Sequence, residues 1–137
     1  MPETNVPDGF SPLFGRSNLL DLLGPFYHRG TGAGMVITFR AEEKHANMRG
    51  FVHGGVLASL ADIALGYVTA FGFDPPRPFV TVNLNINYTN AAKIGDWIEA
   101  RVDPIRSGKT MTFANCYLTV GKMPVAHASA VFSVVTE

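Results

Sequence analysis

A single aspartate in a long apolar stretch is the residue of this sequence that most directly suggests chemistry. Asp62 is the only acidic or basic side chain between Gly54 and Phe71, a proline-free run long enough for about five helical turns. A helix that is apolar around most of its circumference is expected to be buried, and a buried carboxylate is costly unless it is paired or used. The sequence leaves two interpretations open: a catalytic carboxylate, or an aspartate that bonds a neighbouring element.

Two glycines stand where this helix is expected to begin. Gly54 and Gly55 follow His53 directly, and glycine at this point would allow a ligand to approach the backbone closely. The first turn of a helix has unpaired N–H groups and a partial positive charge, which are the ingredients of an oxyanion hole. The alternative interpretation is a flexible start of the helix with no chemical role.

The spacing of these residues carries a family resemblance. The pattern N-x5-H-G-G-x6-D from Asn47 to Asp62 resembles the signature of hotdog-fold acyl-CoA thioesterases of the phenylacetate-pathway (PaaI-like) type. Thr81–Tyr88 resembles the strand that follows the central helix in this family, and Gly95-Asp96 resembles its next turn. The likeness spans roughly residues 12–135. It implies an α+β hotdog fold, with an antiparallel sheet of five to six strands wrapped around one long central helix.

The resemblance also implies roles for five residues in hydrolysis of an acyl- or aryl-CoA thioester. Gly54 corresponds to the residue whose backbone N–H polarises the thioester carbonyl, and Asn47 to the amide that orients substrate or water. Asp62 corresponds to the catalytic carboxylate, either general base or nucleophile. His53 would shape the start of the helix rather than transfer protons, and Thr81 would help to position water.

The nucleotide end of the substrate is less well defined by the sequence. The family often has Arg-Pro after the tyrosine of this strand, whereas this chain has Thr89-Asn90-Ala91. Arg106, Lys109 and Lys93 are candidates for contacts with the coenzyme A phosphates, and they could equally be ordinary solvated charges in turns. Coenzyme A would be part of the substrate, so we expect no separate cofactor. His45 and His53 have no third ligand at a suitable spacing, so we expect no metal.

Composition limits the classes of protein that this chain can belong to. Its 137 residues suit one domain over residues 1–137, with residues 1–10 as a flexible arm. Eleven basic and eleven acidic residues give no excess that would favour nucleic acid, and a charged fraction of 16% suggests surface hidden in an oligomer. Cys116 lies in an alternating strand pattern and is expected to be a packed thiol. We find no N-terminal signal and expect a cytoplasmic protein without a membrane span.

The remaining elements follow from periodicity and turn residues. Ser11 and Pro12 are expected to open a short helix that runs to Gly24-Pro25. Five to six strands are expected, depending on whether the short stretch 26–28 forms one. The last four are joined by short turns and should be antiparallel neighbours. The expected strands are 26–28, 35–40, 79–88, 97–105, 110–120 and 125–136. In the 79–88 strand, alternation predicts that Val80, Val82 and Leu84 share one face, while Thr81 and the asparagines lie on the other.

The distance between the two candidate groups on the helix predicts a shared site. Gly54 and Asp62 are eight residues apart, or roughly 12 Å along a straight helix, so one thioester cannot reach both on the same chain. Two copies with antiparallel helices would bring the helix start of one copy near the acid of the other. The natural contact strip contains Ser59, Asp62, Gly66 and Thr69. The resemblance likewise implies a dimer, or a dimer of dimers (a homotetramer), with sites between subunits.

Two other functions remain compatible with the sequence. A hotdog fold can serve as a non-catalytic acyl-CoA-binding regulator, although the complete Asn, Gly and Asp set argues against it. A hydratase-type hotdog enzyme would need a histidine and an acid acting on a double bond, and Asp62 with His53 does not obviously offer that pair. The acyl group is not identified: Phe71, Phe73 and Phe79 could line an aromatic-accepting pocket or belong to the core.

Overall fold

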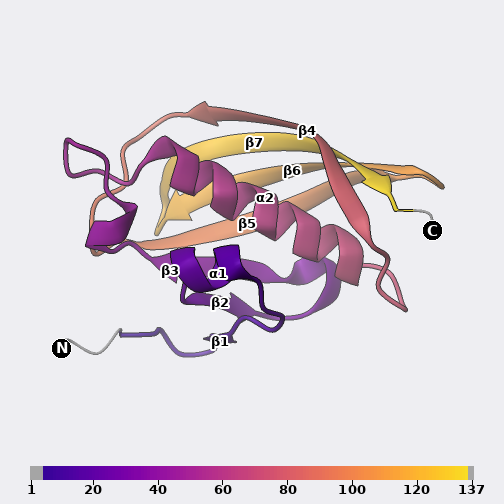
Figure 1. The fold of residues 1–137 in the computed structure, drawn as a ribbon, viewed down its shortest axis with the longest axis horizontal. Coiled ribbons are helices and arrows are strands. Elements are labelled where there is room, and N and C mark those ends of the chain that lie inside the picture. The colour runs from indigo at the N-terminus through magenta and orange to yellow at the C-terminus, as the bar shows by residue number, and fades with distance from the viewer. Residues whose placement is uncertain (1–4, 136–137) are drawn as a thin grey trace.

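The computed structural model describes residues 5–135 and has one long helix lying across a curved antiparallel sheet (Figure 1). The sheet has seven strands in the order β1-β2-β3-β5-β6-β7-β4. The elements are β1 (Ser11–Pro12), α1 (Asn18–Leu23), β2 (Phe26–Arg29), β3 (Val36–Arg40), α2 (Gly54–Phe71), β4 (Phe79–Tyr88), β5 (Trp97–Ser107), β6 (Met111–Val120) and β7 (Met123–Val134). This is the predicted α+β hotdog architecture, with one strand more than the upper limit expected.

The extra strand comes from a stretch that was expected to be helical. Ser11–Pro12 pairs with β2 at the edge of the sheet, a position where proline's missing N–H costs no hydrogen bond. Gly15 then takes a φ of +83°, which is incompatible with a continuous helix from Ser11. The helix α1 therefore begins only at Asn18, and the prediction of a helix from Ser11 is wrong because the Ser-Pro pair also suits an edge strand.

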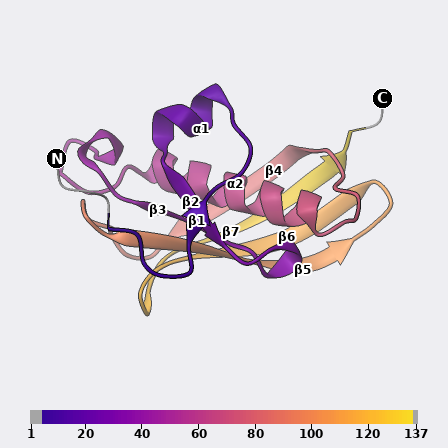
Figure 2. The ribbon, with the colours of Figure 1, turned by 90° about the horizontal axis from the view of Figure 1, so that it is seen from below.

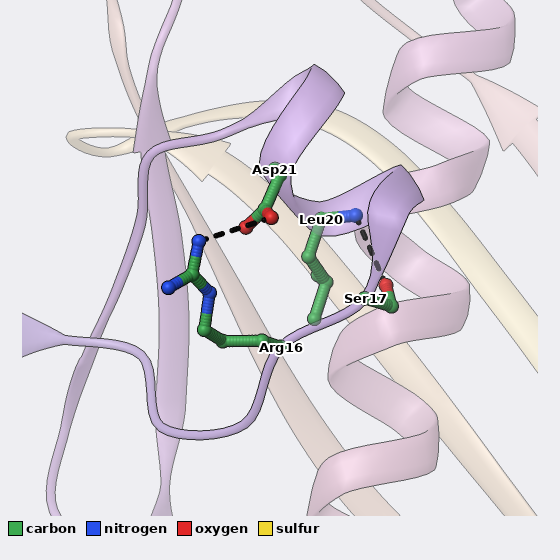
Figure 3. A network of polar contacts seen from close by, with 4 residues as sticks. All are labelled: Arg16, Ser17, Leu20 and Asp21. Carbon is green, nitrogen blue, oxygen red and sulfur yellow. Dashed lines mark hydrogen bonds and ion pairs between the residues drawn. The ribbon is translucent and has the colours of Figure 1, made fainter.

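The start of α1 is closed by local polar contacts (Figure 3). Ser17 is its N-cap, and the Ser17 hydroxyl accepts a hydrogen bond of 3.1 Å from the Leu20 N–H. Arg16 pairs with Asp21 at 3.2 Å on the surface. Figure 2 shows that α1 lies on the same side of the sheet as α2, so the segment before β2 covers part of the long helix.

The last four strands are not all neighbours. β5, β6 and β7 follow one another as predicted, but β4 pairs with β7 rather than with β5 and forms the far edge of the sheet. The chain between Thr89 and Asp96 carries the polypeptide across, so that β5 pairs with β3 on the other side of the sheet. As a result, the edge of β4 that faces away from β7 has no strand partner within residues 5–135.

Helix α2 provides the centre of the core. Its buried residues are Leu57, Leu60, Ala61, Ala64, Leu65, Val68 and Thr69. Helix α2 has 18 residues and a mean hydropathy of 1.5, so by length and composition alone it could cross a membrane. The core helix of a folded domain can have the same length and hydropathy. In this chain the buried face packs against the sheet. Burial of Thr69 corrects the predicted contact strip, because only Ser59, Asp62 and Gly66 of that strip are partly exposed.

Part of the predicted N-terminal arm has defined contacts. Phe10 packs edge-on against Trp97, with ring centroids 5.3 Å apart, and the Arg29 guanidinium lies 4.8 Å from the Phe10 ring. Arg40 donates a hydrogen bond to the carbonyl of Asn5. Residues 1–4 of the arm lie outside the described residues, and its flexibility stays a prediction.

Candidate active site

The start of α2 leaves one backbone donor available. His53 is the N-cap residue, and its Nδ1 accepts a hydrogen bond of 2.8 Å from the Gly55 N–H. The N–H groups of Val56 and Leu57 donate to the His53 carbonyl at 2.9 and 3.2 Å. Among the described residues, no acceptor is found for the Gly54 N–H. Of the first-turn donors, Gly54 is therefore the one that can bind the oxygen of a ligand.

Tyr88 holds the same residue from the other side. The Tyr88 hydroxyl, at the end of β4, donates a hydrogen bond of 2.6 Å to the Gly54 carbonyl. A Cβ atom at Gly54 would lie 3.2 Å from both Cζ and Oη of Tyr88, which is tighter than ordinary contact. The close approach that glycine permits here is thus made by an aromatic ring. Partial burial raises the pKa of the Tyr88 phenol, so it remains a donor.

Tyr88 was not among the predicted site residues. Alternation along the strand places it on the same face as Leu84 and Ile86, a pattern typical of core packing. Its hydroxyl group was the available signal, because a phenol on the face that looks toward the helix can donate a hydrogen bond there. Only the fold shows that this partner is the first residue of the helix.

Asn47 shapes the loop that leads to the helix. Its Oδ1 accepts hydrogen bonds from the N–H groups of Arg49 at 2.9 Å and Phe51 at 3.1 Å. Among the described residues, its Nδ2 group has no protein acceptor, so that amide can bind a ligand. Asn47 and Gly54 border one open groove of about 540 Å³, here called the Gly54 groove, which is lined by Asn47, Arg49, Phe51, Val52, Gly54, Leu57, Tyr88, Thr89, Asn90 and Ala91. Arg49, the one cation lining it, was missed by the sequence analysis.

Asp62 is bonded to Thr81 of β4. The Thr81 hydroxyl donates a hydrogen bond of 2.8 Å to Oδ1 of Asp62. In the single chain Asp62 is half-buried, which corrects the expectation of a buried carboxylate. A single donated hydrogen bond leaves Oδ2 of Asp62 without a protein donor among the described residues, so it is available to water or substrate.

A β-bulge explains how Thr81 reaches the helix. The pairing of β4 with β7 shifts register between Thr81 and Asn83, so Val82 is an extra residue. The shift puts Thr81 on the same face as Leu84 and Ile86, whereas strict alternation predicted the opposite face. Val82 is correspondingly exposed, at 57%.

Asp62 and Thr81 line a second pocket, of about 400 Å³, here called the Asp62 pocket. Its other lining residues are Ile63, Gly66, Tyr67, Ala70, Phe71, Pro78, Phe79 and Phe132. Apart from the Asp62 carboxylate, no lining side chain is charged. The sequence left Phe71, Phe73 and Phe79 as either pocket-lining or core residues. Phe71 and Phe79 line this pocket, whereas Phe73 packs against Phe79 and Arg77. The Gly54 groove and the Asp62 pocket share no lining residue.

The three candidates for phosphate contacts are not brought together in one chain. Arg106 and Lys109 belong to β5 and the β5–β6 turn, where Arg77 donates a hydrogen bond to the Lys109 carbonyl at 3.1 Å. The backbone of Lys93 forms an isolated antiparallel β-bridge with Phe51, which lines the Gly54 groove. Within residues 5–135 no three histidine, cysteine or acidic side chains lie together in a metal-binding arrangement.

Comparisons with known proteins agree with this architecture. A family model described as the thioesterase superfamily matches residues 49–126, more than half of the chain. A Pseudomonas aeruginosa protein provisionally named an esterase is 47% identical over 129 residues, covering 93% of this chain and 96% of that protein. Mouse acyl-coenzyme A thioesterase 13 is 34% identical over 85 residues, covering 62% of this chain and 60% of the mouse protein. The solved structure of the Escherichia coli PaaI protein, from the phenylacetic acid degradation operon, has a TM-score of 0.79 at 20% identity and covers 88% of this chain and 86% of that one.

Proposed function

The chain belongs to the thioesterase superfamily, and we propose that it hydrolyses the thioester bond of an acyl- or aryl-CoA. In this proposal Asp62 is the catalytic carboxylate and the Gly54 backbone N–H donates to the oxyanion. The observation that carries this proposal is the pairing of Asp62 with Thr81 at 2.8 Å on the helix whose first N–H has no acceptor among the described residues. The name of the mouse relative, an acyl-coenzyme A thioesterase, supports acyl-CoA as the substrate class.

The chemistry follows from the placement of charge. The Gly54 N–H would donate to the thioester oxygen, and it would bind this oxygen more strongly as negative charge develops on it. Asp62 would either take a proton from an attacking water or attack the carbonyl carbon itself. In both routes the carbon–sulfur bond breaks, coenzyme A leaves as a thiol, and water supplies the hydroxyl of the free acid. The Thr81 hydroxyl holds one carboxylate oxygen and so orients the other.

Asn47 and His53 have supporting roles in this proposal. Asn47 would orient the substrate or water through its Nδ2 group, while its Oδ1 holds the loop that precedes the helix. His53 accepts from the Gly55 N–H and fixes the first turn, which leaves Gly54 as the donor that faces substrate. Neutral His53 with its proton on Nε2 is the form that can make this contact, because Nδ1 acts as acceptor.

In this proposal, the Gly54 N–H and the Asp62 carboxylate that act on one thioester come from different subunits. Gly54 and Asp62 border separate cavities with no shared lining residue, and roughly 12 Å of helix lies between them. Two copies related by a two-fold axis would place the Gly54 groove of one against the Asp62 pocket of the other. Ser59, Asp62 and Gly66 of the predicted contact strip on α2 are partly exposed. An added Cβ at Gly66 would meet no atom within 4 Å, so a second helix has room to approach.

The outer edge of β4 supports this assembly. β4 is ten residues long and has one strand partner within the described chain. A long unpaired edge readily pairs with another strand, and two-fold pairing of β4 with its copy would join the two sheets and align the helices antiparallel. From the family resemblance we further propose that two such dimers associate into a homotetramer. We also propose a cytoplasmic location.

The test is a hydrolysis assay that detects the free thiol of coenzyme A. Purified protein should cleave acyl-CoA substrates of several chain lengths and an arylacetyl-CoA, and Asp62→Asn should remove most of this activity. EDTA should leave the rate unchanged, because the proposal uses no metal, and no separate cofactor should be required. The proposal fails if the wild-type protein binds acyl-CoA without releasing thiol, or if activity is lost with EDTA and restored by a divalent ion.

A further inference from the structure

The N-terminal segment contacts the wall of the Asp62 pocket, and we propose that Phe14 and Gly15 set the acyl-group selectivity of the enzyme by fixing the side chain of Tyr67. This inference rests on the proposed thioesterase function, because it concerns the pocket next to the reacting carboxylate. It assigns a role in specificity to a segment more than forty residues before that carboxylate in the sequence.

Tyr67 is held from outside the pocket by the backbone of this segment. Its hydroxyl donates a hydrogen bond of 2.7 Å to the Phe14 carbonyl. Gly15 has a φ of +83°, and a Cβ atom there would lie 2.7 Å from the Tyr67 Oη. Glycine at position 15 is therefore required twice, once for the backbone conformation and once for the room that the tyrosine hydroxyl occupies.

The Phe14 ring supports the same wall. It packs edge-on against Tyr67 with ring centroids 5.3 Å apart and against Phe71 at 4.9 Å. His28 of β2 packs on Phe14 at 5.2 Å, which anchors the cluster to the sheet. Tyr67 and Phe71 are stacked at 5.8 Å, and both line the Asp62 pocket. The two aromatic side chains thus lie between Phe14 and the space next to Asp62.

This arrangement gives the Asp62 pocket an aromatic wall, formed by Tyr67 and Phe71. The Tyr67 hydroxyl is occupied by the Phe14 carbonyl, so the tyrosine offers a substrate mainly its ring. Partial burial raises the pKa of the Tyr67 phenol, so the hydroxyl stays protonated and keeps this contact in the neutral range. The space available to an acyl group then depends on where the Phe14-Gly15 segment holds Tyr67.

Two substitutions in the segment should move the selectivity in opposite directions. Phe14→Ala removes the support behind Tyr67 and Phe71, so their rings can move outward and longer acyl groups fit. Gly15→Ala puts a methyl carbon 2.7 Å from the Tyr67 hydroxyl oxygen, so the ring is pushed toward the pocket and longer acyl groups are excluded. Tyr67→Phe removes only the hydrogen bond to Phe14 and should shift selectivity in the same direction as Phe14→Ala, but less.

The experiment measures kcat/KM for straight-chain acyl-CoA substrates of roughly four to twelve carbons, with wild type and these three variants, since each methylene group in an apolar pocket can change selectivity about tenfold. Leu22→Ala is the matched control, because Leu22 is an apolar residue of the nearby helix α1 and is 69% exposed. The ratio of kcat/KM for long over short substrates should rise about tenfold or more in Phe14→Ala and fall by a similar factor in Gly15→Ala. Circular dichroism and Tm establish that each variant is folded.

The results separate this inference from the proposed function. Hydrolysis by the wild type, with ratios in the three variants equal to those in wild type and Leu22→Ala, would overturn the role of the segment and leave the thioesterase intact. A fall in kcat/KM by the same factor for every substrate would also overturn it, because it would show general damage rather than a change of pocket. If Gly15→Ala fails to fold, Tyr67→Phe and Phe14→Ala decide the question by the direction of their ratios. Absence of hydrolysis in the wild type would defeat both proposals.

Discussion

Replacing Gly54 by alanine tests the start of α2 with the smallest possible change. The added Cβ would lie 3.2 Å from Cζ and Oη of Tyr88, so the ring must move by a few tenths of an ångström. If the only consequence is loss of the 2.6 Å hydrogen bond between Tyr88 and Gly54, the cost is about 1 kcal/mol, or roughly fivefold in rate. If the peptide turns so that its N–H no longer meets the oxyanion, the cost is about 3–4 kcal/mol, or roughly 10²–10³-fold in kcat.

Steady-state kinetics on one good acyl-CoA substrate measures this effect. Gly34→Ala is the matched control, because a Cβ at Gly34 meets no atom within 4 Å and its φ is not positive. We expect Gly54→Ala to lose between about fivefold and about 10³-fold in kcat/KM while Gly34→Ala keeps the wild-type value. In a Tyr88→Ala background the further loss caused by Gly54→Ala should shrink by at least about 1 kcal/mol, because the clashing ring is gone.

Two results would refute this reasoning. A folded Gly54→Ala enzyme with wild-type kcat/KM would show that the Gly54 peptide does not bind the reacting carbonyl. Equal losses from Gly54→Ala with and without the Tyr88 ring would show that the contact between them has no part in positioning the donor.

Three further predictions follow from the same structure. Asp62→Asn should lower kcat by about 10²–10⁴-fold, as loss of a catalytic base does, with little change in Tm because the carboxylate is half-buried; kinetics and thermal unfolding check this, and near wild-type turnover would contradict it. Burial raises the pKa of the Cys116 thiol from 9.0 to about 12, so the contribution of the buried thiol to folding stability is present below pH 9 and is lost as pH rises toward 12. Thiol labelling at about pH 8, below the ordinary thiol pKa, should be far slower in the native protein than in denaturant. Equal labelling rates would place Cys116 outside the core. Val82→Lys, which puts like charges on two facing copies of the β4 edge, should weaken dimerisation in sedimentation velocity, whereas an unchanged dimer would show that subunits associate elsewhere.

The parts of the fold that depend on local pattern could be predicted from the sequence. Helix α2 was expected from its apolar run, and its start at Gly54 follows from the glycines after His53. The buried Cys116 was expected from the alternation of β6. In each case the information lies within a few residues of the feature that it predicts.

Features that depend on distant residues could not be derived in this way. The alternation of β4 continues unbroken through Val82, so nothing local indicates that the strand bulges there and turns Thr81 toward Asp62. Thr81 was named as a candidate from the family resemblance, while its alternation pointed to the other face. The pairing of β4 with β7 likewise depends on the path of the whole chain, and the contact of Tyr88 with Gly54 depends on that pairing.

The structure gives the positions of the candidate residues within one chain. Asp62 and Thr81 lie together, and Asn47 and Gly54 border one groove. Arg106 and Lys109 are in the β5–β6 hairpin, whereas Lys93 lies near the Gly54 groove. If two subunits form each site, contacts with coenzyme A can come from both, so all three cations stay predicted phosphate contacts.

The most direct test of the shared site is complementation between two inactive chains. Gly54→Val and Asp62→Asn are purified separately, mixed in equal amounts and allowed to exchange subunits, which native mass spectrometry can follow. A mixed dimer would have one site with both groups intact, so about a quarter of wild-type activity should return when half of the dimers are mixed and one of their two sites is restored. No recovery in a sample that contains mixed dimers would contradict the central claim that Gly54 of one subunit and Asp62 of another act on the same thioester.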